Sequence, residues 1–154
     1  MNSRESSVKR GKRGSVEALV VDASVLAPLI FVKGKDLLWL AKNYNFNVLD
    51  LTIYEVCNAF WKESTLLGRI SPENAVEACS LIHSLLRYMK MWSVTDLDLT
   101  DIQRIAIENR LAFYDSSYIY LARNLNSPLA TEDTEMAKIA ENLGITVYRL
   151  SHFL

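Results

Sequence analysis

Along the chain, short apolar runs alternate with longer stretches in which apolar residues recur at helical spacing. The short runs predict buried strands, and the longer stretches predict helices that bury one face. The predicted strands cover residues 19–22, 46–50, 91–94, 128–131 and 145–150. The predicted helices cover residues 24–31, 35–44, 52–67, 71–90, 100–109, 116–124 and 134–142. This alternation is typical of an α/β fold.

Local signals set several of the predicted helix ends. Ser71 stands where an N-cap is expected, and Pro72 follows it at the first helical position. Gly68 and Gly144 are expected to end the helices that precede them. Pro28 is expected to limit the length of the first helix, because proline lacks the backbone N–H that a helix interior uses.

The composition is that of one ordinary globular domain. The chain has 154 residues, of which 50% are hydrophobic and 23% are charged, and this length supports one core without disulfides. The net charge is −1, so a nucleic-acid partner would have to be bound by a local patch or through a metal ion. Cys57 and Cys79 lie in apolar helical contexts and suit a reducing cytoplasm.

The first fifteen residues differ from the rest. Four basic residues lie close together there: Lys9, Arg10, Lys12 and Arg13. We interpret residues 1–15 as a flexible basic arm before a single domain at residues 16–154. The arm is either a solvated tail or a contact for nucleic-acid phosphates.

The same region imitates a secretory signal, because an apolar run follows the basic residues. Asp22, Ser24 and Pro28 interrupt that run, and a cleavage signal does not follow it. The apolar runs are also shorter than the roughly 20 residues of a membrane span. We therefore expect a cytoplasmic protein without a membrane partner.

Two aspartates follow predicted strands. Asp22 ends the first strand, and Asp133 follows the strand at residues 128–131 with one residue between. Ligands of parallel α/β proteins lie outside the carboxyl ends of the strands, so the two carboxylates are expected at one edge of the sheet. Aspartate is also a favoured N-cap, and capping explains either residue equally well when it is taken singly.

Two further acids interrupt apolar surroundings. Glu55 shares a polar helical stripe with Asn58 and Lys62, where the plain alternative is an exposed residue that pairs within the stripe. Asp115 lies in "LAFYDSSYIYLA", a stretch so apolar that a charge there needs a partner. Asp115 also fits an N-cap for a helix that begins at Ser116. Together the four acids indicate one site more strongly than any of them does alone.

Four segments, in this order and at these separations, resemble the PIN-domain nucleases: "VVDASVL", "TIYEVCNAFWK", "FYDSSYIYLA" and "LATEDTEMAKIAENLGI". In particular they resemble the VapC-like toxins of bacterial and archaeal toxin–antitoxin pairs, over residues 19–147. The resemblance implies a three-layer α/β/α fold around a central, mainly parallel sheet of four or five strands. The arm before Ser15 lies outside the pattern, so nothing carries over to it.

The resemblance also implies a metal-dependent endoribonuclease. Four acids would converge on one or two Mg²⁺ or Mn²⁺ ions: Asp22, Glu55, Asp115 and Asp133. The supporting polar residues would be Ser24, Asn58 and Thr131. The physical chemistry agrees, because carboxylates in a partly dry cleft repel one another by on the order of several kcal/mol. A hard divalent cation relieves that repulsion and acidifies a water for attack on a phosphodiester.

Two other functions remain open. A PIN-like binding module without activity would keep the fold and use the acids structurally. An aspartyl-phosphate protein, either a phosphatase of the haloacid dehalogenase type or a receiver domain, would also place an aspartate such as Asp22 at a strand end. The phosphatase needs an aspartate where Ser24 stands, and the receiver needs an acidic pair before Asp22, which "ALVVD" does not offer.

Two apolar segments bear on partners. One is residues 37–40, and the other is the second half of the helix at residues 52–67 with Phe60, Trp61, Leu66 and Leu67. Such residues belong either to the core or to an interface. The resemblance implies an RNA substrate, a homodimer and a small antitoxin that covers the cleft.

Overall fold

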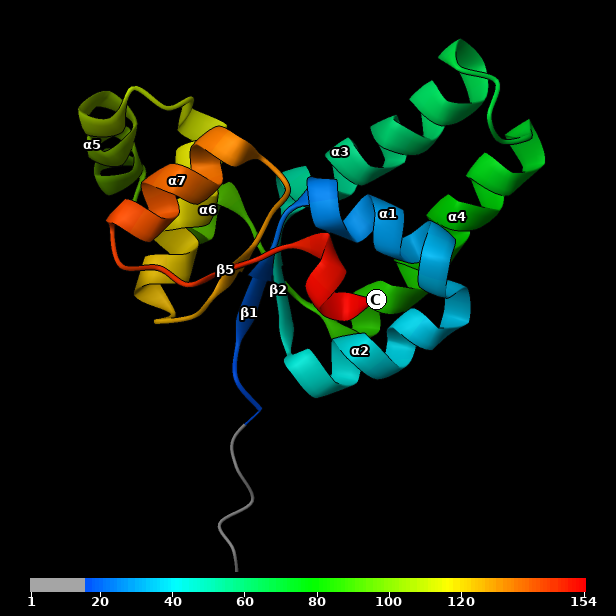
Figure 1. The fold of residues 1–154 in the computed structure, drawn as a ribbon, viewed down its shortest axis with the longest axis horizontal. Helices are drawn as coiled ribbons and strands as arrows, with labels where there is room; N and C mark the ends of the chain where they lie inside the picture. The colour runs from blue at the N-terminus through cyan, green and yellow to red at the C-terminus, as the bar shows by residue number, and fades with distance from the viewer. Residues whose placement is uncertain (1–15) are drawn as a thin grey trace, which may run out of the picture.

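A computed structural model describes residues 16–154. The predicted basic arm, with Lys9, Arg10, Lys12 and Arg13, lies outside the described residues. The described part folds around one sheet with strand order β3-β2-β1-β4-β5, in which every pairing is parallel (Figure 1). Its strands are β1 (Leu19–Val21), β2 (Phe46–Leu49), β3 (Lys90–Trp92), β4 (Leu129–Ala130) and β5 (Val147–Tyr148). The predicted parallel α/β fold is confirmed.

Helices connect the strands in the predicted alternation. They are α1 (Ala23–Lys33), α2 (Leu37–Tyr44), α3 (Asp50–Trp61), α4 (Pro72–Leu85), α5 (Leu99–Asn109), α6 (Phe113–Asn124) and α7 (Thr134–Asn142). A π-helical segment at Lys62–Leu66 continues α3. Short 3-10 turns lie at Gly34–Asp36, Leu86–Tyr88, Val94–Asp96 and Leu150–Phe153. Ser71 caps α4, as its sequence predicts, and its hydroxyl accepts the N–H of Asn74 at 3.1 Å.

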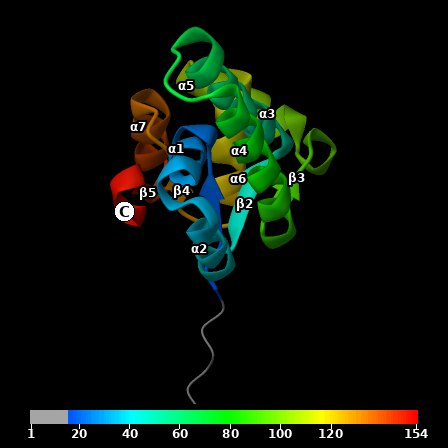
Figure 2. The same cartoon turned by 90° about the vertical axis from the view of Figure 1, so that its right-hand side faces the viewer.

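Two apolar cores lie on the two faces of the sheet. Leu19 and Val21 of β1 face one core, which they share with buried side chains of α1, α2, α3 and α4. Val20 faces the other core, which joins the sheet to α5, α6 and α7. Figures 1 and 2 show the sheet between these two groups of helices. The alternation of side chains along β1 thus produces the three-layer α/β/α arrangement.

The strand β1 is central and sets the position of everything at its carboxyl end. Leu19 pairs with Phe46 of β2, and Val21 pairs with Ala130 of β4. Because the strands are parallel, their carboxyl ends meet at one edge of the sheet, which lies at the top of β1 in Figure 1. Residues that follow β1 and β4 are therefore brought together from distant parts of the chain.

The helix α1 is longer than its sequence predicts. Pro28 lies inside it, and the helix ends only at Lys33, so the expectation that Pro28 limits its length is wrong. Pro28 removes one helical hydrogen bond, which costs about 3 kcal/mol. Several side chains of the same helix are buried, and each contributes roughly 1.5–3 kcal/mol: Val25, Leu26, Leu29 and Ile30. Tertiary burial therefore outweighs the proline.

The two apolar segments that the sequence offers as core or interface, residues 37–40 and the second half of the helix predicted at residues 52–67, each have buried and exposed side chains. Leu37 and Leu40 are buried, whereas Trp39 is 64% exposed. Phe60 is buried, whereas Leu66 is 62% exposed at the far end of α3. Each segment therefore contributes to the core and also leaves large apolar side chains at the surface. Among the described residues, the helices are too short or too polar to cross a membrane.

Candidate functional site

Asp22 caps α1 and is buried at the carboxyl end of β1. The residue is 4% exposed, and its Oδ1 accepts the backbone N–H of Val25 at 3.3 Å. The Ser24 hydroxyl donates to Oδ1 at 2.6 Å, and the Thr131 hydroxyl donates to Oδ2 at 2.5 Å. Burial nevertheless raises the pKa of Asp22, because desolvation outweighs these donors.

The loop after β4 fixes both of these hydroxyl groups. The backbone N–H of Glu132 donates to Ser24 Oγ at 2.8 Å, and the backbone N–H of Asp133 donates to Thr131 Oγ1 at 3.0 Å. The carboxyl ends of β1 and β4 are therefore joined through polar side chains as well as through the sheet. The position of the Asp22 carboxylate is determined by both segments.

Glu55, on α3, lies close enough to Asp22 for the charge of one carboxylate to affect the other. Burial, followed by the charges of Asp22 and Asp115, raises the pKa of Glu55 to about 7. The described residues contain the ion pairs Glu63–Arg69 and Asp101–Arg123, and Glu55 is in neither. The alternative in which Glu55 pairs within an exposed polar stripe is therefore wrong.

Asp115 lies in the first turn of α6. Because α6 begins at Phe113, the alternative in which Asp115 caps a helix that starts at Ser116 is wrong. Burial raises the pKa of Asp115, and so do the charges of three acids: Asp133, Asp22 and Glu135. These Coulombic effects indicate that Asp115 lies near the acids of the other strand ends.

Asp133 has two roles in the structure. It is the N-cap of α7, and its side chain accepts the N–H of Met136 at 2.7 Å. Its charge also raises the pKa of Asp115. Capping a helix and lying beside the other acids are therefore compatible, in Asp133 as in Asp22. We call the carboxylates of Asp22, Glu55, Asp115 and Asp133 the acidic cluster.

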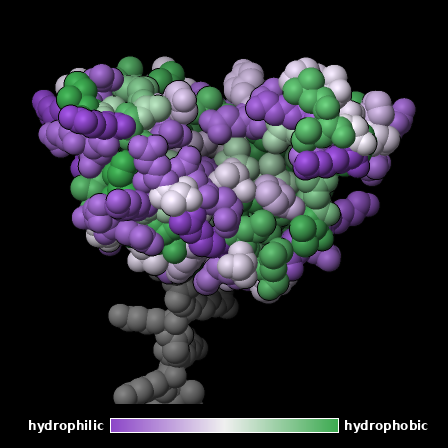
Figure 3. All heavy atoms as spheres, turned by 45° about the horizontal axis from the view of Figure 1, so that its top comes forward, coloured by the Kyte–Doolittle hydropathy of each residue, from purple (hydrophilic) through white to green (hydrophobic). Residues whose placement is uncertain are grey.

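The supporting polar residues separate into two groups. Ser24 and Thr131 contact Asp22 directly. Asn58 is exposed, and its side chain makes no hydrogen bond within residues 16–154. In Figure 3, the top edge of the molecule dips between the two groups of helices, and hydrophilic residues lie in the dip.

Tyr118 is a residue of this region that sequence reasoning missed. It is 1% exposed, and its hydroxyl lies 2.8 Å from the hydroxyl of Thr52 on α3. Burial, followed by the charge of Glu55, raises the pKa of Tyr118. Its spacing of three residues from Asp115 on one helix was the available signal, since such residues share a face.

The donor set suits a hard divalent cation. All four groups of the acidic cluster are carboxylates, and the charges that shift the pKa values of Asp22, Glu55 and Asp115 include no cation. Within residues 16–154, no three Asp, Glu, His or Cys side chains already stand as a joint ligand set. Mg²⁺ binds through one or two carboxylates and keeps several waters, so the chemistry of these residues fits such an ion.

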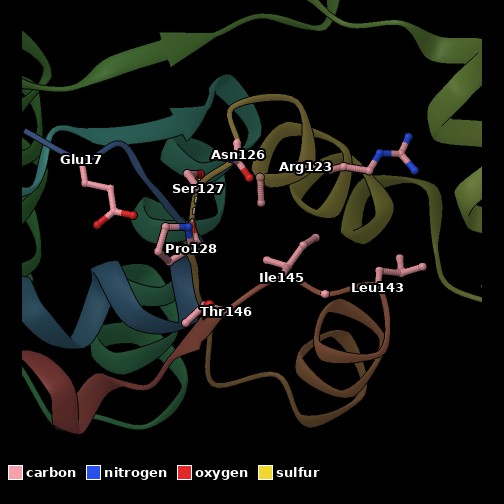
Figure 4. A pocket seen from close by; sticks show the side chains of 10 residues that line it. Glu17, Arg123, Asn126, Ser127, Pro128, Leu143, Ile145 and Thr146 are labelled. Carbon is pink, nitrogen blue, oxygen red and sulfur yellow. Dashed lines mark hydrogen bonds between the residues drawn. The ribbon is translucent and has the colours of Figure 1, made fainter. Parts of the chain in front are cut away.

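A separate hollow lies at the opposite edge of the sheet (Figure 4). Its volume is about 330 Å³, and its lining includes Glu17, Ser127 and Thr146, which precede β1, β4 and β5. Arg123 also lines it and donates to Asp101 at 2.8 Å. This hollow lacks a group of acids comparable to the acidic cluster, so we assign it no chemistry.

Comparison with known proteins gives consistent relationships. The PIN domain family model matches residues 19–142. Exonuclease VapC9 of Pyrobaculum aerophilum is 35% identical over 117 residues, which cover 76% of this chain and 81% of that protein. Ribonuclease VapC3 of the same organism is 27% identical over 123 residues, which cover 78% and 92% of the two chains.

A solved structure agrees with this relationship. The crystal structure of PAE2754 from Pyrobaculum aerophilum matches with a TM-score of 0.69 at 28% identity, and the match covers 97% of this chain and 95% of that one. The family match begins in β1 and ends in α7, so it includes every member of the acidic cluster. The chain therefore belongs to the PIN-domain family.

Proposed function

We propose that this protein is a metal-dependent endoribonuclease and the toxin of a toxin–antitoxin pair. The observation that supports this most directly is the acidic cluster, in which the charge of Asp22 raises the pKa values of both Glu55 and Asp115. Like charges held together destabilise a fold unless a cation shares them. The names of the relatives, exonuclease VapC9 and ribonuclease VapC3, support nuclease chemistry and a toxin role.

Each residue of the proposed site has a distinct role. Asp22, Asp115 and Asp133 would hold one or two Mg²⁺ or Mn²⁺ ions, and Glu55 would bind an ion directly or through a water. When bound, the ion supplies an acidified water and positive charge at the phosphoryl oxygens. The hydroxyls of Ser24 and Thr131 hold the carboxylate of Asp22 in one orientation, which fixes the ligand before substrate binds.

Cleavage of single-stranded RNA tests this proposal. We expect the purified chain to cut RNA in Mg²⁺ or Mn²⁺ and to be inactive in EDTA. Asp22→Asn and Asp115→Asn should each lower the rate by about 100-fold or more, a loss typical of a removed catalytic group. Asp36→Asn is a matched control, because Asp36 is exposed and makes no cap hydrogen bond at the start of α2.

The outcomes also separate the alternatives. Full activity in EDTA would contradict the metal dependence. RNA binding without cleavage in Mg²⁺ would indicate a binding module that has kept the fold. A circular RNA distinguishes the mode of attack, since only an endonuclease can open it, whereas one relative is named an exonuclease.

We further propose that the protein forms a homodimer and binds a small antitoxin in the cytoplasm. Large apolar side chains are exposed on α1, on α4 and around the end of α3: Phe31, Val32, Trp61, Leu66, Leu67 and Val76. Apolar residues gathered on one part of a surface commonly mark an interface. Co-expression with the product of the adjacent gene, followed by light scattering of the purified complex and of the free chain, tests both partners.

A further inference from the structure

One arginine contacts the residue that follows β4. Arg149 follows β5, whose partner in the sheet is β4. Its Nη1 donates to the backbone carbonyl of Thr131 at 3.2 Å. Thr131 is the residue whose hydroxyl donates to Asp22. The guanidinium is thus attached to the same strand end that holds the buried aspartate.

Within residues 16–154, Arg149 is in no ion pair. The ion pairs there are Glu63–Arg69 and Asp101–Arg123. Glu132 lies close to it in the fold, but its Oε1 accepts the backbone N–H of Leu150 at 2.6 Å. An arginine carries five N–H donors, and within residues 16–154 the Arg149 side chain makes one hydrogen bond.

We propose that Arg149 binds a phosphate of the substrate backbone beside the phosphate that is cleaved. This inference rests on the proposed nuclease function. A substrate strand carries a charge on every linkage, and the acidic cluster repels it until cations are bound. The guanidinium held at the Thr131 carbonyl supplies a fixed positive charge at the residue whose hydroxyl donates to Asp22, and its planar donors match the oxygens of a phosphate. Arg149 is a binding residue that positions the strand.

The salt dependence of binding measures this contact directly. Each phosphate bound on a single strand releases counterions, and the slope of log K against log salt falls by about 0.7 for each contact that is lost. The assay titrates the full chain with a fluorescent single-stranded RNA in Ca²⁺ at several salt concentrations. A gel after the titration checks that the RNA is intact.

Three variants give the contrast. Arg149→Gln should weaken binding about 5- to 10-fold and reduce the slope by about 0.7. Arg149→Lys should keep the slope, because it keeps the charge, and should still bind less tightly because it loses the paired donors. Arg87→Gln is the matched control. Arg87 is exposed and precedes β3, so it lies at the amino-terminal ends of the strands, away from the acidic cluster. Its loss should leave the slope unchanged.

A second measurement identifies which phosphate of the RNA is contacted. A neutral methylphosphonate is placed at one linkage of the RNA at a time. In the parent protein, the slope of log K against log salt should fall when the replaced linkage is the one near the cleavage site that Arg149 contacts. The same replacement should have no further effect in Arg149→Gln, as expected for two changes that remove one contact.

The results distinguish this inference from the proposed function. An unchanged slope in Arg149→Gln, together with a lower melting temperature, would show that Arg149 only joins β4 to β5 and would overturn the inference. A slope that depends on Arg149 in a protein that does not cut RNA in Mg²⁺ would support the phosphate site and contradict the nuclease.

Discussion

The hydroxyl of Thr131 makes a measurable contribution to stability through Asp22. Thr131→Val removes the donor to Oδ2 of a carboxylate that is 4% exposed. Losing a hydrogen bond to a buried charged group costs about 1.5–3 kcal/mol, and we expect the variant to lose that amount in urea unfolding at pH 7. Thr131→Ser keeps the hydroxyl and should lose less. Identical midpoints for valine and serine would show that this bond does not stabilise the protein.

The raised pKa of Glu55 predicts a pH-dependent effect of Glu55→Gln in EDTA. The folded pKa of about 7 lies above the ordinary value of 4.5, so the folded state binds more protons between these values. The parent therefore loses stability as pH rises from 4.5 to about 7, and the loss is complete above that. Glu55→Gln has no carboxylate at this position, so the variant does not show this loss of stability.

We expect Glu55→Gln to be more stable than the parent by about 1 kcal/mol at pH 8 and to match it near pH 4. The magnitude is well below what the shift alone implies, since solvent screens a half-buried group. Urea unfolding at the two pH values checks this. A stabilisation that is equal at pH 4 and pH 8 would mean that the folded state does not raise the pKa of Glu55.

At the level of single side chains, the sequence indicated the acids and not their contacts. Asp22 and Asp133 were recognisable because each follows an apolar strand, a signal within a few residues. Tyr118 and Arg149 were not, since their roles depend on Thr52 and Thr131 in other segments. Pairwise contacts between distant segments are set by the fold and leave little local pattern.

The helix α7 provides a test that separates capping from catalysis. Asp133→Asn keeps most of the capping ability and removes one charge beside Asp115. Asp133→Ala removes both the cap and the charge, and losing the cap costs about 1 kcal/mol of stability. We expect the melting temperature in EDTA to rise in the asparagine variant and to fall in the alanine variant, and both variants to lose RNA cleavage. An active asparagine variant would restrict Asp133 to capping.

Helix ends were predictable where their signals are local. α7 spans Thr134–Asn142 as its sequence indicates, and α4 begins at Pro72, directly after its N-cap Ser71. The start of α6 at Phe113 and the passage of α1 through Pro28 were not. In α1, side chains buried on both sides of Pro28 outweigh the proline, and such burial depends on what packs against the helix. Phe113 and Tyr114, which extend the start of α6, are exposed, so burial does not explain that earlier start.

For the whole molecule, metal binding should appear as added stability. Mg²⁺ or Mn²⁺ that binds only the folded acidic cluster stabilises it by mass action, by about 2.7 kcal/mol when the free ion is 100 times its Kd. We expect the melting temperature of the parent to rise with added Mn²⁺. Asp22→Asn should show a smaller rise, and the Asp36→Asn control should respond like the parent. Equal shifts in all three would mean that the ion binds elsewhere.

The central position of β1 affects how the protein folds during synthesis on the ribosome. Asp22 leaves the ribosome early, but Thr131 and Asp133 follow β4, which is synthesised much later and then pairs with β1. Synthesis proceeds at about 5–20 residues per second, so a nascent chain holds an incomplete acid set for several seconds. Such a chain should be harmless to the message that encodes it. Activity would begin only after β4 has joined the sheet, and a partner made at the same time could already be present to bind it.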